Sequence, residues 1–249
     1  MATCPNFQIL QLLESSLDRQ EEAAWCIRQM EQNYHEADKF RWSLNSFLRA
    51  LQEVLQLVSM EIQSKPDIVR WFREHRAALD SDPLIALFFK RRNMVVHKSM
   101  LKPSSKGSVG YTRGRGLKIG LSMPIDPLDD SQVAILRYIG HVAKTDFDFL
   151  GILYTKDDGG GEYTCVQREW RLKDFPDQEV TQLCAQAWER VAGLTVATAQ
   201  KMGANVVIPN FELGNPHSVQ FEIYRPEWVN EQLSIAKVRH AESARSEST

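Results

Sequence analysis

An arginine, an asparagine and a histidine lie within six residues of this chain, in the run RNMVVH at 92–97. A guanidinium keeps its charge at any relevant pH and can bind a phosphate through two parallel hydrogen bonds. An imidazole titrates near neutrality and can transfer protons. On a helix, Asn93 and His97 are four residues apart and share a face, with Arg92 about 100° round from Asn93. These residue types and spacings therefore suit anion binding combined with proton transfer.

The run belongs to a helix that the sequence predicts from Pro83 to about Met100. The apolar stripe of this helix consists of Ile85, Phe88, Phe89, Val95 and Val96. Arg92 falls on the same face, and because burying an unpaired arginine is costly, it must meet a carboxylate, a cleft or an anionic ligand. The alternative to a ligand site is an internal pair with a carboxylate such as Glu53, with His97 as a helix-end histidine favoured by the helix dipole.

The same helix opens a basic window in the sequence. Residues 83–125 contain nine Lys and Arg and no Asp or Glu, which leaves 21 cations against 32 anions in the rest of the chain. This asymmetry favours an anionic partner, of which nucleic acid is the commonest, although a solvated basic loop has the same composition. Within the window, Lys98, Arg113 and Arg115 are candidate phosphate contacts for RNA, and Tyr111 is a candidate stacking ring.

Hydrophobic periodicity predicts the elements that must position these residues. The strongest helix is 35–63, which lacks Gly and Pro and buries a stripe formed by Phe40, Leu44, Phe47, Leu48, Leu51, Leu55, Val58 and Ile62. Other helices are predicted at 7–33, 67–78, 83–100 and 176–202, with 131–144 as a further candidate. β-rich stretches are predicted at 117–123, 147–155 and 162–172, and 103–118 is a Gly- and Ser-rich cationic segment.

The run 92–97 in this setting resembles the signature of the HEPN domain family (higher eukaryotes and prokaryotes nucleotide-binding). That signature is an Arg, usually followed by a polar residue, and a His after four to six positions, on the third helix of a four-helix bundle. Asn93 stands at the polar position. The stretch 168–177 is similar to the approach to the last helix of that bundle. The resemblance covers roughly residues 35–102 and 168–202.

The resemblance implies a mainly α, α+β fold, in which a HEPN-like four-helix bundle carries a small antiparallel β insertion between the motif helix and the last long helix. The expected divisions are 1–102 with 173–203 as the bundle, 103–172 as the insertion, 204–236 as a short β or irregular segment, and 237–249 as a disordered tail. A separate α+β domain at the C-terminal side fits the same order of elements.

The resemblance also implies a metal-independent RNA endonuclease that works as a homodimer, as a toxin or defence effector. It makes Arg92, His97 and Asn93 the catalytic residues, with Arg91 as the alternative to Arg92, and needs no cofactor. His97 would exchange a proton with the RNA 2′-OH or the leaving 5′ oxygen, giving a 2′,3′-cyclic phosphate. An antitoxin or regulatory protein is a further expected partner. Two alternatives stay open, a non-catalytic nucleotide-binding or dimerisation module and an unrelated helical scaffold.

Composition narrows the class of protein further. The 249 residues are 43% apolar and 25% charged, which is ordinary globular composition. The four cysteines are widely spaced, so reduced, buried thiols are expected rather than a zinc site or a disulfide framework. Aspartate clusters at 126–130 and 146–148 lack the spacing of a known metal loop, and no metal site is predicted. No leader peptide and no membrane span is recognised, and a cytoplasmic location is expected.

Overall fold

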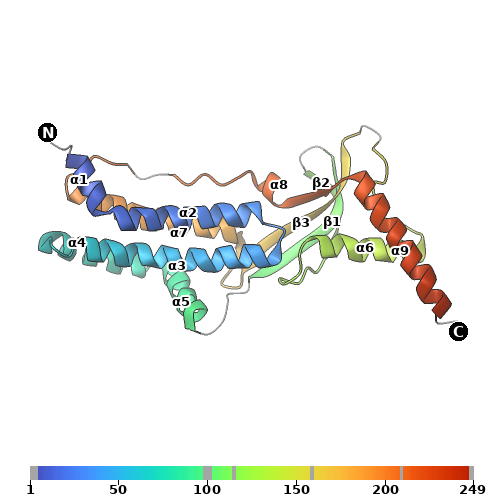
Figure 1. Cartoon of the computed structure of the whole chain (residues 1–249), viewed down its shortest axis with the longest axis horizontal. Helices are drawn as coiled ribbons and strands as arrows, with labels where there is room; N and C mark the ends of the chain where they lie inside the picture. Colours follow the sequence, from blue (N-terminus) through green and yellow to red (C-terminus); the bar gives the residue numbers. More distant parts are fainter. Residues whose placement is uncertain (1–4, 98–102, 114–115, 158–159, 208–209, 247–249) are drawn as a thin grey trace. The chain divides into compact units, whose positions relative to one another are not determined.

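The computed structural model describes residues 5–97, 103–113, 116–157, 160–207 and 210–246. Within these ranges the chain forms helices and a five-stranded antiparallel sheet (Figure 1). It divides into two compact units. Unit 1 contains residues 1–32, 39–102 and 178–213, and unit 2 contains residues 33–38, 103–177 and 214–249. The fold is therefore mixed α/β, and the prediction of a mainly helical α+β chain with an antiparallel sheet is confirmed. The finer prediction of a four-helix bundle with a small β insertion was wrong, because the sheet unit has helices of its own.

Unit 1 is helical. Its elements are α1 (Pro5–Leu12), α2 (Glu14–Gln32), α3 (Ala37–Glu61), α4 (Pro66–Asp80), α5 (Pro83–His97) and α7 (Val180–Lys201). Helices α2, α3, α4 and α7 lie along roughly one direction, and α5 turns away from them (Figure 1). All eight apolar residues of the stripe predicted for 35–63 are at most 1% exposed, so this prediction is confirmed. Long helices with one apolar stripe thus build the core of this unit.

Helix α7 closes the core of unit 1 by packing against α2, α4 and α5. Trp188 anchors it to α2, because its indole N–H donates to the carbonyl of Gln20 at 2.8 Å. The helix begins at Val180 and not at 176, because the Glu179 carboxylate accepts the backbone N–H of Thr181 and acts as the N-cap. The preceding residues form strand β4 (Phe175–Glu179).

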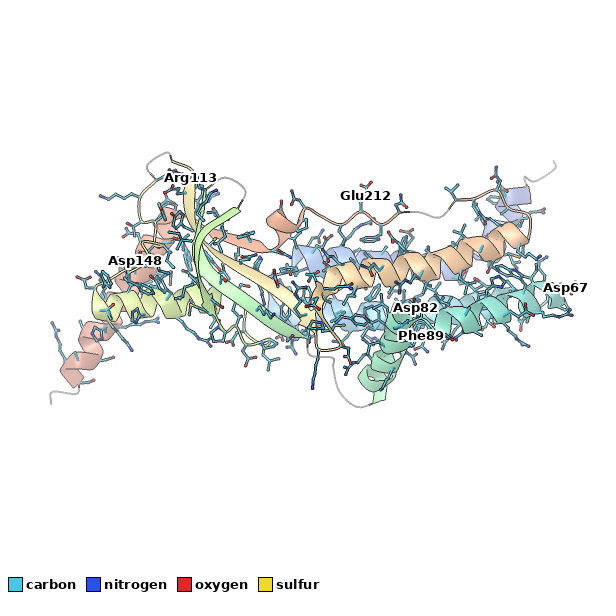
Figure 2. The ribbon with its side chains drawn as sticks, turned by 180° about the vertical axis from the view of Figure 1, so that it is seen from behind. Asp67, Asp82, Phe89, Arg113, Asp148 and Glu212 are labelled. Carbon is cyan, nitrogen blue, oxygen red and sulfur yellow. The ribbon has the colours of Figure 1, made fainter. Side chains whose placement is uncertain are left out.

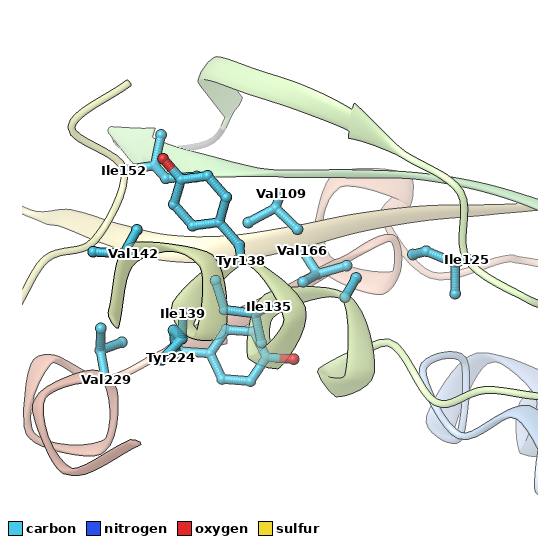
Figure 3. Close-up of a cluster of buried hydrophobic side chains, with 11 residues drawn as sticks. Val109, Ile125, Ile135, Tyr138, Ile139, Val142, Ile152, Val166, Tyr224 and Val229 are labelled. Atoms are coloured by element: carbon cyan, nitrogen blue, oxygen red, sulfur yellow. The ribbon is translucent and has the colours of Figure 1, made fainter. Parts of the chain in front are cut away.

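The sheet has the strand order β2, β1, β3, β4, with β5 also paired to β3, and all of it except the last two residues of β4 belongs to unit 2. The other strands are β1 (Ser104–Arg113), β2 (Gly116–Met123), β3 (Glu162–Leu172) and β5 (Phe221–Tyr224). Strand β3 is central, and its Val166 lies opposite Val109 of β1. Helices α6 (Gln132–Thr145) and α9 (Pro226–Ser246) pack on the face that carries these valines (Figure 3), and α8 (Pro216–Val219) precedes β5.

Most of the Gly- and Ser-rich cationic segment 103–118 forms strand β1 and the start of β2. Two glycines that suggested a loop allow close approach within the sheet instead. A Cβ at Gly107 would lie 2.1 Å from the side chain of Ile125, and one at Gly110 would lie 2.0 Å from the carbonyl oxygen of Ile119. Low side-chain volume at these positions is thus a requirement of strand pairing and packing.

The stretch 147–155 forms no strand in the part of the chain that the structure describes. The carboxylate of Asp148 accepts the backbone N–H groups of Ile152 and Leu153, at 3.2 and 2.8 Å, and so turns the chain. Gly151 adopts a positive φ of 59°, which is incompatible with an extended strand. Apolar composition alone therefore misled the prediction here.

The predicted irregular segment at 204–236 and disordered tail from 237 were also wrong in part. Helix α9 extends from Pro226 to Ser246, and it joins unit 2. Its first half is anchored because Val229 is fully buried and Trp228 and Leu233 pack on the sheet core. Once this half is fixed, the Ala- and Arg-containing second half continues the helix at little cost.

Candidate functional site

Helix α5 carries the predicted catalytic residues, and its first turn is fixed by Asp82 (Figure 2). The Asp82 carboxylate accepts the backbone N–H groups of Leu84 and Ile85 at 3.0 and 3.2 Å, and it forms an ion pair with Arg190 of α7. Pro83 occupies the first helical position, where its missing N–H costs nothing. The start of α5 is therefore held by a cap and by a contact to a second helix.

The inner face of α5 matches the predicted apolar stripe where the structure describes its side chains. Ile85 and Phe88 are fully buried, and Phe89 is half-buried. The ring of Phe88 meets Phe47 of α3 edge to face, with centroids 6.1 Å apart. This packing anchors the first half of α5 in the core of unit 1 and leaves its charged half to project from a fixed base.

The charged half begins with exposed Lys90 and half-buried Arg91 and Arg92. The Nε atom of Arg92 is buried, so part of this guanidinium lies out of water, as its place on the apolar stripe predicted. Glu53, the carboxylate proposed as an internal partner of Arg92, lies 3.4 Å from Arg19.

Helix α5 is continuous through Asn93 to His97, so the predicted helical placement of both is confirmed. Their side chains, and Lys98 as a whole, lie outside the described residues. Helix geometry alone puts Arg92 and His97 about 140° apart around the axis and about 7.5 Å apart along it. Asn93 and His97 are only about 40° apart, so they share a face and Arg92 does not.

The predicted RNA-binding residues Tyr111 and Arg113 lie on β1, in unit 2. Figure 2 labels Arg113 near the end of this strand. Arg113 is engaged, because its Nε lies 2.6 Å from a carboxylate oxygen of Glu162. The other oxygen of Glu162 accepts the Tyr154 hydroxyl at 2.5 Å, and the ring of Tyr154 packs 5.3 Å from Tyr111. Arg115 lies outside the described residues. The predicted catalytic and RNA-binding residues thus belong to different compact units.

A buried polar cluster in unit 2 was missed by sequence reasoning. Arg168 is fully buried on β3 and donates to the carbonyls of Asp129 and Asp126, at 2.7 and 3.3 Å. Its guanidinium also lies 3.7 Å from the centre of the Trp170 ring. Burial lowers the pKa of Arg168 to about 10. The alternation of β3, which puts Arg168 between Val166 and Trp170 on the core face, is the signal that could have revealed it.

His35 belongs to the same unit and contacts Ser131 and lies near Glu222, residue types that suggest a catalytic triad. The geometry is different. Its Nδ1 lies 2.8 Å from the Ser131 hydroxyl and 4.0 Å from Glu222, so both groups approach the same nitrogen. Nε2 donates to the carbonyl of Val219 at 3.0 Å, and Ser131 is fully buried. This arrangement holds elements together and offers no accessible nucleophile.

The aspartates of unit 2 that were considered as weak cation ligands hold the fold instead. The Asp148 carboxylate accepts the Tyr138 hydroxyl at 2.6 Å, and Asp146 pairs with Lys237 at 2.6 Å. Burial and the contact with Asp148 raise the pKa of Tyr138 well above its ordinary range. No group of three or more His, Cys, Asp or Glu side chains that could hold a metal ion occurs among the residues that the structure describes.

Three cysteines within the described ranges, Cys26, Cys165 and Cys184, are free and buried, as expected. Burial raises the pKa of each thiol, to about 11 for Cys26 and about 12 for Cys165. Buried neutral thiols of this kind are poor nucleophiles. In the same ranges, no helix is long and apolar enough to span a membrane.

Comparison with known proteins tests the resemblance to the HEPN family. Residues 4–109 match the family model described as bacteriophage lambda protein ea47. This ea47-like segment contains the run 92–97 and covers less than half of the 249 residues. No match was found among curated proteins or among solved structures. The assignment to the HEPN family was therefore wrong, because the segment that carried the resemblance matches a different family and nothing supports HEPN.

Proposed function

We propose that this protein is an RNA endonuclease that needs no metal ion and that acts through Arg92, Asn93 and His97 at the end of α5. The observation that carries the proposal is the placement of all three on one continuous helix, whose base is fixed by Asp82 and whose Arg92 is partly withdrawn from water. A partly desolvated guanidinium interacts more strongly with a phosphate than one in bulk water.

The reaction needs only proton transfer and charge stabilisation. The RNA 2′-oxygen attacks the adjacent phosphorus, its proton passes to the imidazole of His97, and the bond from phosphorus to the 5′ oxygen breaks. The imidazolium of His97 then gives its proton to the leaving 5′ oxygen, and the products are a 2′,3′-cyclic phosphate and a 5′-hydroxyl. Arg92 stabilises the charge on the non-bridging oxygens, and Asn93 orients the imidazole or the phosphate. DNA has no 2′-OH and is not a substrate.

The separation of Arg92 and His97 around α5 has a consequence for the site. At about 140° apart, the two side chains of one helix approach a bound phosphate from different sides. Two copies of α5 that face each other could supply the guanidinium from one copy and the imidazole from the other. A homodimer therefore belongs to the proposal, as does an RNA contact from Lys98, which follows the helix directly. A toxin or defence role would be the biological setting.

The test is an RNA cleavage assay in the presence of EDTA. We expect His97→Ala to lower the cleavage rate by about 100-fold or more, and Arg92→Ala by a similar factor. His75→Ala and Arg70→Ala on α4 are matched controls, because both residues are exposed and lie away from α5 in sequence. Arg91→Ala separates the two candidate arginines. Cleavage that EDTA abolishes, or that both α5 variants retain, contradicts the proposal.

Mixing the two inactive variants tests the shared site. If each site combines Arg92 of one copy with His97 of the other, a mixed dimer of His97→Ala and Arg92→Ala contains one intact site. At equal amounts, half of the dimers are mixed, and one of the two sites in each mixed dimer is intact. We therefore expect the mixture to recover up to about a quarter of the wild-type rate. No recovery, with both variants dimeric, means that each site is built within one copy. RNA binding without cleavage by the wild type would instead indicate a non-catalytic module.

A further inference from the structure

A groove lies between α6 and α9 in unit 2, with a volume of about 780 Å³. Its apolar lining consists of Leu136, Ile139, Ile235, Ala236 and Ala244, with Gly140 among them. A Cβ at Gly140 would meet no atom within 4 Å, so the groove is open above this glycine. The backbone of α6 is therefore accessible to a group from another molecule.

Apolar side chains around the groove are exposed to an unusual extent. Leu136 is 39% exposed, Ile235 is 37% exposed and Val238 is 58% exposed. The opposite side of α9 is packed, because Val229 is fully buried and Leu233 contacts the sheet core. Helix α9 thus has one apolar face inside unit 2 and a second that stays exposed among the described residues of that unit. Leu136 and Ile235 line the same groove, so their exposed apolar side chains lie together, as at an interaction site.

The charges around this face are complementary to one another. The groove lining includes the cations Lys144 and Arg239, together with His240, and the lining contains no Asp or Glu. Exposed carboxylates occur on α9 itself, at Glu231 and Glu242. Glu231 stands four residues before Ile235 and Arg239 stands four residues after it, so each lies about 40° round from Ile235 on the same exposed face.

The symmetric placement of Glu231 and Arg239 about Ile235 suits a second copy of α9 as the partner. If two α9 helices pack antiparallel about a two-fold axis at Ile235, Arg239 of each copy lies at the height of Glu231 in the other. The exposed Ile235 and Val238 then pack in the seam, and side chains of the second copy enter the cationic groove. A helix of 21 residues is about 32 Å long, which is sufficient length for such a contact. Self-complementary patches related by a two-fold axis are the commonest basis of homodimers.

We propose that the exposed face of α9, together with the α6–α9 groove, is a self-association surface that receives α9 of a second copy in antiparallel orientation. The proposal does not depend on the RNA chemistry of α5. His97→Ala changes the chemistry of α5 and leaves an α9 contact intact, whereas the Arg239 and Glu231 variants change the α9 contact and leave α5 intact. The two proposals therefore fail separately.

The experiment measures molar mass by sedimentation velocity, at protein concentrations from about 1 μM to about 1 mM, without RNA. Wild-type protein should rise from 28.5 kDa toward twice that mass with concentration. Arg239→Glu places two carboxylates opposite each other at both ends of the seam, and Glu231→Arg places two cations there. We expect each single variant to raise the dimer Kd about tenfold or more, because two symmetric attractions become repulsions.

The double variant Arg239→Glu with Glu231→Arg is the decisive measurement, because it restores both pairs with reversed polarity. We expect its Kd to return to within about threefold of wild type. Lys156→Glu is the matched control, since it makes the same charge change at an exposed residue of unit 2 outside the groove. A wild type that stays at 28.5 kDa throughout overturns the proposal, and so does a double variant no tighter than the single variants.

A second variant tests the groove by shape. Gly140→Trp places an indole in open space above α6, where it meets no atom of its own chain within 4 Å at the Cβ, and it removes a helix-weakening glycine. We expect the variant to keep the wild-type circular dichroism spectrum and to lose self-association. A folded variant that dimerises as tightly as wild type would show that the groove is not part of the interface and would overturn its inclusion. Binding of an acidic amphipathic peptide by a strictly monomeric wild type would assign the groove to a different protein.

Discussion

Protonation of His35 should lower the free energy of unfolding, because the buried site of this side chain in unit 2 favours the neutral imidazole. The pKa of this side chain falls from its ordinary value of 6.5 to about 4, mainly because of burial, with a further contribution from the positive charge of Arg168. The hydrogen bond from Nε2 to the Val219 carbonyl acts in the opposite direction. The folded protein therefore holds a neutral imidazole, which donates through Nε2 and accepts the Ser131 hydroxyl through Nδ1.

The sign and size of the effect follow from linkage. Because the folded pKa lies below the unfolded one, the unfolded chain takes up the proton first as the pH falls. The contribution of neutral His35 is complete above pH 6.5 and is lost as the pH falls from 6.5 through about 4. A shift from 6.5 to about 4 corresponds to about 3 kcal/mol of unfolding free energy, with a slope approaching 1.4 kcal/mol per pH unit.

The assay is urea unfolding followed by circular dichroism between pH 4 and pH 7.5, for wild type and His35→Gln. Glu222 lies 4.0 Å from His35 and its own pKa is raised by burial, so only the difference between the two proteins isolates the histidine. We expect His35→Gln to be less stable at pH 7 and the difference to shrink by about 3 kcal/mol toward pH 4. His75→Gln, at an exposed histidine of α4, is the control. Parallel pH profiles for wild type and His35→Gln would refute the reasoning.

Two further predictions concern elements that position the sites. Gly110→Ala brings a Cβ to 2.0 Å from the Ile119 carbonyl oxygen and should lower the free energy of urea unfolding by about 2–4 kcal/mol. Gly140→Ala meets no atom within 4 Å and should raise that free energy by about 0.5–1 kcal/mol. Equal effects of the two variants would contradict the packing of β1 against β2. Asp82→Ala removes the α5 cap and the ion pair with Arg190, and it should lower the free energy of unfolding by about 1–2 kcal/mol. The control Asp67→Ala, at an exposed residue of α4, should lower it by about 0.5 kcal/mol. Similar losses in both variants would show that the cap does not hold α5.

The helices were predictable where one apolar stripe decides their burial. The residues of α3 from Phe40 to Ile62 recur at three- and four-residue spacing, and any helix with that pattern must bury one face. Strand β3, at Glu162–Leu172, was likewise predicted at its observed bounds because of its β-rich composition. By contrast, strand β1 was not predicted, because its glycines have low β propensity. Gly107 and Gly110 leave room for atoms of Ile125 and Ile119 that come close only in the folded sheet.

The candidate site was predictable only as far as helix geometry reaches. The sequence correctly placed Arg92 on the inner side of α5, because Ile85 and Phe88 define that side. It could not reveal the engagement of Arg113 by Glu162, since these residues are far apart in sequence and meet only through the pairing of β1 with β3. It also could not reveal the contacts of Arg168, whose acceptors are backbone carbonyls that carry no signal in residue type.

The basic window illustrates how far a charge pattern can support a function. Its nine cations form one run in sequence, but the structure places Arg91 and Arg92 in unit 1 and Arg113 in unit 2. Arg113 already has a carboxylate partner at 2.6 Å, so its charge is largely balanced within the sheet. An excess of like charge along the chain therefore predicts an anionic partner only at those positions where the fold leaves the charge unbalanced. For this protein the argument for RNA rests on α5 and is independent of the strands that follow it.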